Sequence, residues 1–181
     1  MNVFVKTTHY CIGAIDCLNE WIGRSVAWLT FAMVLVSFTI VVLRYGFNAG
    51  WIAMQDSVKF MHALVFMLGA AYTLRHDEHV RVDILYQRMS DKARAWIDVL
   101  GTLFLLFPVS AFTLWSSWDY VGDAWAIRES SRDSGGLEGV YLLKTSIPIM
   151  AALLIVQGTA QCLRNLMILA GHPPSGALEE N

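Results

Sequence analysis

The stretch SVAWLTFAMVLVSFTIVVL, residues 25–43, runs for 19 residues without a charged side chain. At about 1.5 Å per residue, a helix of this length crosses a hydrocarbon core of about 30 Å. Two further stretches have the same character: residues 99–118 with 20 uncharged residues and residues 145–163 with 19. Each of the three predicts a transmembrane helix.

The composition agrees with a membrane protein. Of the 181 residues, 56% are hydrophobic and 15% are charged, whereas an ordinary soluble domain carries about 25% charged residues. The charge lies mostly in the connections between the apolar stretches. The net charge of −2 gives no reason to expect a nucleic-acid partner.

A fourth apolar stretch, residues 60–74, is shorter and contains His62. Its 15 residues reach only about 22 Å as a helix, so it must extend upstream into WIAMQDSVK. Asp56 and Lys59 then lie one turn apart at the membrane interface, where they can pair. The sequence therefore predicts an all-α integral membrane protein whose four transmembrane helices cover about residues 24–44, 54–74, 97–118 and 145–166.

The two ends of the chain are more polar than these helices. Residues 10–22 place Cys11, Ile15, Leu18 and Ile22 on one helical face. This amphipathic segment either lies along the inner membrane surface or forms the first turns of a longer helix. Residues 171–181 form a polar tail, and no cleavable signal peptide is visible. We expect residues 1–181 to make a single membrane domain.

The basic residues predict the orientation. If the N-terminus is cytoplasmic, eight of the 13 lysines and arginines fall on the inner side. The positive-inside rule therefore places both termini in the cytoplasm.

The sequence gives little reason to expect a metal, haem or catalytic site. His76 and His79 stand among acids, but the arginines between them oppose a cation, so a metal site is disfavoured. Haem held between two histidines is disfavoured because His62 has no second histidine within a membrane stretch. Hydrolase and ATPase motifs are absent from the sequence. We therefore expect neither an enzyme nor a bound cofactor.

One side of the second helix suggests a contact face. Asp56, Lys59 and His62 follow at steps of three residues, and Phe66, Gly69 and Thr73 roughly continue the stripe. Intramembrane polar residues usually face protein, so this side is a candidate contact for another membrane protein. The chain is then expected to be a helper that anchors or scaffolds something larger.

Several motifs resemble a known family. They are RYGFN at 44–48, QD at 55–56, LGAAYTLRHDEHVRVDILYQR at 68–88 and IP at 147–148. Together they resemble the DctQ-like small membrane subunit of tripartite ATP-independent periplasmic (TRAP) transporters.

That resemblance implies a role. A soluble periplasmic binding protein captures an organic acid, and a large membrane subunit moves it by an elevator-like motion driven by a sodium gradient. The small subunit packs beside the large one as a fixed scaffold in the bacterial inner membrane, with lipid around it. Ion sites are then expected in the large subunit rather than here.

The resemblance also implies which residues matter. His79, Arg81 and Asp83 match the family's HVRVD element at the inner end of the second helix, and we expect this element to support docking. The full set of candidates for the subunit interface is Asp56, Lys59, His62, Gly69, Arg75, His79, Arg81 and Asp83. Two alternatives remain open, namely a membrane anchor of a redox enzyme and a small membrane protein that works alone.

Overall fold

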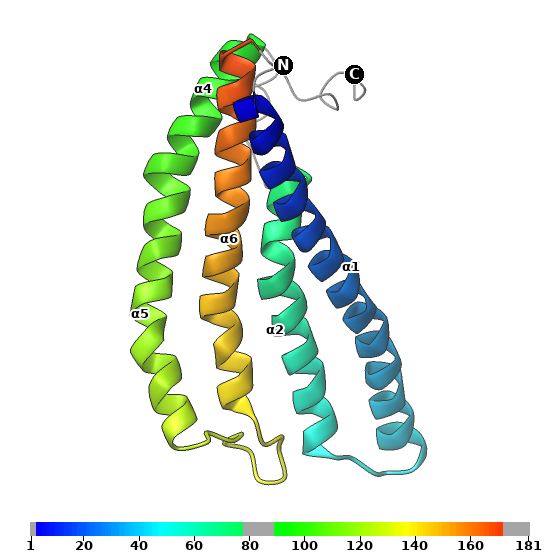
Figure 1. Cartoon of the computed structure of the whole chain (residues 1–181). Coiled ribbons are helices and arrows are strands. Elements are labelled where there is room, and N and C mark those ends of the chain that lie inside the picture. The colour runs from blue at the N-terminus through cyan, green and yellow to red at the C-terminus, as the bar shows by residue number, and fades with distance from the viewer. Residues whose placement is uncertain (1–2, 78–88, 172–181) are drawn as a thin grey trace.

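The computed structural model describes residues 3–77 and 89–171, which form long helices running up and down in alternation (Figure 1). The helices are α1 (Val3–Gly46), α2 (Ile52–Arg75), α4 (Asp91–Gly101), α5 (Phe107–Ala126) and α6 (Val140–Leu169), with a π-helical segment η1 (Thr102–Leu106) between α4 and α5. Because α4, η1 and α5 are continuous, the described residues contain four helices long and apolar enough to cross a membrane. This confirms the predicted all-α membrane fold.

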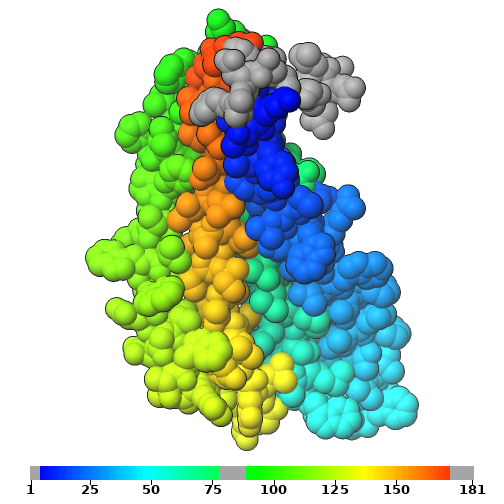
Figure 2. All heavy atoms as spheres, in the orientation of Figure 1, coloured from blue at the N-terminus to red at the C-terminus, as the bar shows by residue number. Residues whose placement is uncertain are grey.

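Helix α6 lies at the centre of the bundle. It packs against α1, α2, α4, η1 and α5, and Figure 2 shows α1 and α5 on opposite sides of it. Much of the core is alanine, with Ala71, Ala95, Ala124, Ala151 and Ala160 all buried. Such small side chains let helix backbones approach closely, which drives association where lipid replaces water.

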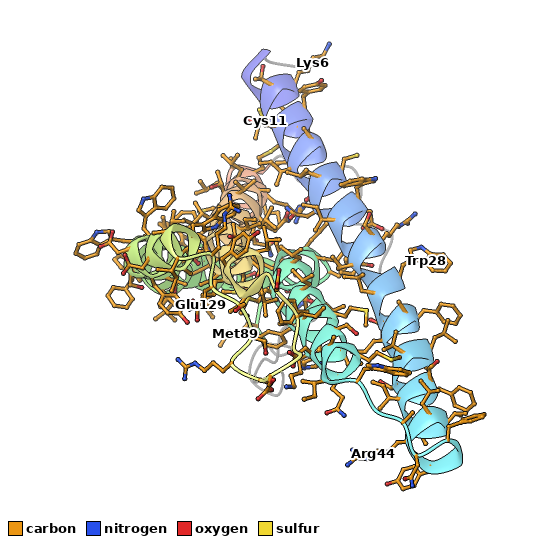
Figure 3. The ribbon with its side chains drawn as sticks, turned by 90° about the horizontal axis from the view of Figure 1, so that it is seen from below. Lys6, Cys11, Trp28, Arg44, Met89 and Glu129 are labelled. Carbon is orange, nitrogen blue, oxygen red and sulfur yellow. The ribbon has the colours of Figure 1, made fainter. Side chains whose placement is uncertain are left out.

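Large apolar side chains point outward instead. Trp28 and Phe38 on α1 and Phe112 and Trp115 on α5 are all exposed, and Trp28 points away from the bundle in Figure 3. A soluble protein would rarely expose so many. In a bilayer these side chains contact lipid.

Helix α1 is one continuous helix of 44 residues. Residues 10–22 are therefore the first turns of a longer helix, the second of the two alternatives. The side of this segment that packs against the bundle carries Ile12 and Asn19, both buried, whereas Cys11 and Leu18 of the expected apolar face are exposed. The apolar pattern did not identify the buried side because that side includes a polar amide.

Pro108 lies near the middle of the third membrane helix, where the helix changes type. Proline has no backbone N–H, so it cannot complete the usual bond to the preceding turn. Thr102–Leu106 adopts π-helical geometry, and the N–H of Phe107 donates to the carbonyl of Thr102. The widened turn packs on Gly158 of α6, where an added Cβ would lie 2.6 Å from Leu106 Cδ2.

The four predicted transmembrane ranges each lie within one continuous helix of the structure.

The first residues of α1 and the last residues of α6 lie at the same end of the bundle, which we call the inner end (Figure 1). The connections 47–51 and 127–139 lie at the opposite, outer end. Viewed from the outer end, α1 runs obliquely away from the other helices toward Arg44 (Figure 3).

Candidate functional site

Charged side chains from three helices meet at the inner end. Arg164 Nη2 donates to Asp16 Oδ2 over 2.7 Å, and Arg75 Nη1 donates to the backbone carbonyl of Asp16 over 2.9 Å. Arg75 also pairs with the carboxylate of Glu20, whose Oε2 lies 3.0 Å from His76 Nε2. Two acids on α1 thus hold basic groups from α2 and α6, which fixes the three helices together.

Two amides extend this network into the core. Asn19 is 1% exposed and Gln157 is 0% exposed. Asn19 Nδ2 donates to Gln157 Oε1 over 2.7 Å, and Gln157 Nε2 donates to Asp16 Oδ1 over 3.1 Å. Together these residues form the inner cluster: Asp16, Asn19, Glu20, Arg75, His76, Gln157 and Arg164.

A second polar cluster lies at the outer end around Asp56, which is 2% exposed. Asp56 Oδ1 accepts from Lys59 Nζ over 2.9 Å, and Oδ2 accepts from the backbone N–H of Leu137 over 3.2 Å. The hydroxyl of Ser131 also bonds this carboxylate. Because Leu137 and Ser131 belong to the connection between α5 and α6, Asp56 ties that loop to the first turns of α2.

Glycine is required where the loop passes Asp56. A Cβ added at Gly136 would lie 2.5 Å from Asp56 Oδ2 and would collide with Ser131. Lys59 Nζ also lies 3.7 Å from Asp133 Oδ2, so a second loop residue joins the group. The outer cluster is thus Asp56, Lys59, Ser131, Asp133, Gly136 and Leu137.

Elsewhere on α2, the outward side is not used by the chain itself. His62 and Phe66 are exposed, and His62 makes no hydrogen bond within the described residues. A Cβ added at Gly69 would meet no atom within 4 Å. Beside Gly69 lies a groove of about 500 Å³ between α1 and α2, whose walls include Ala27, Thr30, Val65, Phe66, Gly69 and Ala70.

The predicted interface candidates therefore separate into groups. Asp56 and Lys59 form the expected ion pair, while Arg75 belongs to the inner cluster. His62 and Gly69 lie on the exposed side of α2. His79, Arg81 and Asp83 lie outside the described residues, so the HVRVD element stays a prediction. The described residues, 3–77 and 89–171, contain no group of three or more His, Cys, Asp or Glu side chains that could hold a metal ion.

Most of the inner cluster was missed by sequence reasoning. Gln157 carried a usable signal, because a side-chain amide within an uncharged run of membrane length must find a partner. Asp16 and Glu20 lie within residues 10–22, for which the sequence predicts an amphipathic segment and no structural ion pair. Only their neighbours on α2 and α6 show that they are structural acids, and a single sequence does not contain that information.

Comparison with known proteins identifies the family of this chain. Residues 33–167 match the family model described as "Tripartite ATP-independent periplasmic transporters, DctQ component". The C4-dicarboxylate TRAP transporter small permease protein DctQ of Vibrio cholerae is 27% identical over 105 residues, which cover 58% of this chain and 44% of that protein. The sialic acid TRAP transporter permease protein SiaT of Haemophilus influenzae is 26% identical over 98 residues, covering 54% of this chain and 15% of that protein.

Both alignments thus span less than half the length of these relatives. Comparison with solved structures gave no significant match.

Proposed function

Because this multi-pass membrane chain belongs to the DctQ-component family of TRAP transporters, we propose that it is the small scaffold subunit of a sodium-coupled importer of organic acids. As a member of that family it is a transporter component and not an enzyme. The observation that carries the proposal is the family match over residues 33–167, which includes α2, α5 and most of α6.

The polar contacts support a scaffold. A pathway for a charged substrate needs polar side chains that can exchange their partners for the substrate. In this chain Asp16, Glu20, Arg75 and Arg164 bond one another across helices, and Asp56 bonds its own outer loop. These contacts hold the bundle in one arrangement, as expected of a subunit against which a larger protein moves.

The partners follow from the same family. We propose that the chain packs in the bilayer beside a large membrane subunit and that a periplasmic binding protein delivers the substrate. The likeness to 15% of the much longer sialic acid permease protein supports a larger membrane partner. The relatives' names indicate C4-dicarboxylates and sialic acid, both organic acids, as first substrates to test.

The proposed location is the bacterial inner membrane with both termini in the cytoplasm. In this orientation the inner cluster lies on the cytoplasmic side and the outer cluster on the periplasmic side. Support comes from the eight lysines and arginines that the sequence then places inside, against five outside.

The HVRVD element keeps its proposed docking role. Arg81 and Asp83 would exchange charge-assisted hydrogen bonds that fix this segment for contact with the large subunit. An Asp83→Ala variant should lower the yield of the complex, and unchanged yield and transport would contradict this role.

The test of the proposed function is uptake in cells that lack the gene. Deletion should abolish sodium-dependent uptake of at least one labelled organic acid, and a plasmid copy should restore it. Undiminished uptake of every tested acid after deletion, with sodium-dependent uptake present in the parent strain, would refute the proposal. A Soret band in the purified protein would instead favour the membrane anchor of a redox enzyme.

A further inference from the structure

The outward side of α2 carries a regular stripe. Its members follow one another at alternating steps of four and three residues, the spacing of a helix that packs along another helix. At 3.6 residues per turn they fall within an arc of about 80°. We call this set the α2 stripe: Gln55, Lys59, His62, Phe66, Gly69 and Thr73.

The outer part of the stripe faces away from the bundle, and its inner part borders the groove between α1 and α2. Gln55, Lys59, His62 and Phe66 are all exposed, and Phe66 is 72% exposed. Ala71, which lies on the other side of the helix, is 1% exposed. The spacing is thus typical of a helix contact, yet within the described residues α1 leaves an open groove beside the inner part of the stripe and the outer part is exposed.

His62 shows that lipid is not the natural neighbour of this side. If residues 54–74 cross the bilayer, His62 lies about 12 Å inside the outer end of that span and about 18 Å from the inner end. Ionisable side chains at such depth face protein or a water-filled cavity. An acyl chain can offer no hydrogen bond to the imidazole, and within the described residues His62 has none.

Gly69 gives a second, independent indication. At Gly23 the missing side chain is needed by the chain itself, because a Cβ there would collide with the ring of Tyr72. At Gly69 a Cβ would meet nothing within 4 Å. The absence of a side chain at Gly69 therefore serves no contact within the described fold, while it deepens the groove of about 500 Å³ between α1 and α2.

We propose that the α2 stripe and this groove form the docking site for one transmembrane helix of the large membrane subunit. That helix lies against the stripe, approaches most closely at Gly69 and presents a hydrogen-bond acceptor to His62. The assignment rests on the proposed function, since it requires a large subunit. It leaves Asp56 and Arg75 out of the interface, because both are bonded within the chain and neither is exposed. Lys59 also bonds Asp56, but its side chain is exposed beside His62.

A second copy of the chain fits this surface less well. Copies inserted in the same orientation would be related by a twofold axis along the membrane normal. This axis would place Lys59 near Lys59 and His62 near His62. Two Lys59 ammonium groups would repel each other, and neither could accept a hydrogen bond from the other. Two His62 rings could share one hydrogen bond, whereas a different helix can offer an acceptor to both Lys59 and His62.

The first test is co-purification of the large subunit with the tagged chain from membranes that contain both. Gly69→Leu should lower the recovered large subunit about tenfold, because a leucine fills the groove. Gly101→Leu is the matched control, since a Cβ at Gly101 also meets nothing within 4 Å, and it should have no effect. His62→Leu should lower recovery about threefold, and His62→Gln, which retains N–H donors, should restore it.

A second test identifies the neighbour directly. The photoreactive residue p-benzoylphenylalanine, introduced in place of Phe66, should give an adduct with the large subunit. The same probe in place of Phe112, which is 64% exposed on α5, should give none. An adduct of the chain with itself at position 66 would overturn the proposal in favour of a second copy, and an adduct with the large subunit only from position 112 would also overturn it.

The outcomes separate the two proposals. If the wild-type chain recovers no large subunit, the proposed function fails and the docking site fails with it. If the wild type and Gly69→Leu recover it equally, or if position 66 labels only lipid in an intact complex, the docking site is wrong and the proposed function stands.

Discussion

Replacing Gln157 with leucine should destabilise the bundle by an amount that depends on Asn19. In the wild type, Gln157 accepts from Asn19 Nδ2 over 2.7 Å and donates to Asp16 Oδ1 over 3.1 Å. Asp16 keeps its bonds to Arg164 and Arg75 in the variant. Asn19 keeps only a 3.3 Å bond to the carbonyl of Ile15, so the main loss is the contact between the two buried amides.

The expected cost is about 1–2 kcal/mol. A buried donor left without a partner costs about 1–3 kcal/mol in soluble proteins, and hydrogen bonds between membrane helices average about 0.6 kcal/mol with a maximum near 1.7. Asn19→Leu should cost a similar amount for the same reason. For a chain of this length each kcal/mol lowers the melting temperature by about 2–4 °C.

The double variant separates this contact from general packing. Asn19→Leu combined with Gln157→Leu replaces both buried amides with apolar groups, so neither partner is left unsatisfied. It should be less destabilised than the sum of the single variants by about 1 kcal/mol. The measurement is the thermal unfolding of the purified protein in detergent, followed by tryptophan fluorescence.

This reasoning would be refuted if the losses of stability in the two single variants added up to the loss in the double variant. It would also be refuted if the single variants had the melting temperature of the wild type. Either result would mean that the two amides do not depend on each other. The contact between Asn19 and Gln157 would then not contribute to holding α1 against α6.

Three further predictions follow from the packing. Gly158→Leu should lower the stability of the purified chain by about 1–3 kcal/mol, because the new leucine collides with Leu106 in the π-helical turn. Gly101→Leu is the control, and equal melting temperatures of the two variants would contradict this prediction. Gly136→Val should release the outer loop from Asp56 and speed trypsin cleavage after Arg132. Gly122→Val is the control, because a Cβ at Gly122 meets nothing within 4 Å. Equal cleavage rates in the two variants would contradict this prediction. Arg164→Gln should weaken the link between α6 and Asp16, seen as a lower melting temperature than that of Lys6→Gln, and equal melting temperatures would count against this link.

The fold could be predicted from the sequence because lipid imposes simple requirements. A membrane span must be long, apolar and helical, and residues 25–43, 99–118 and 145–163 meet these requirements alone. The shorter second span was found by the same length argument and by the pairing of Asp56 with Lys59, which the structure confirms.

The clusters could not be predicted to the same degree, because they depend on which helices are neighbours. Asp56 was expected at an interface with another subunit, yet its second oxygen accepts from Leu137, which is 81 residues away in the chain. Arg75 was expected at the same interface, and within the chain it bonds Asp16 and Glu20; its place at the interface stays a prediction. Periodicity places residues on a face of a helix, and it does not tell whether that face meets the same chain or a partner.

The most direct test of the scaffold role is uptake by proteoliposomes. The large membrane subunit would be reconstituted with and without this chain, with the periplasmic binding protein outside and a sodium gradient across the bilayer. We expect sodium-dependent uptake of an organic acid only when both membrane subunits are present. Equal uptake by the large subunit alone would contradict the proposed role.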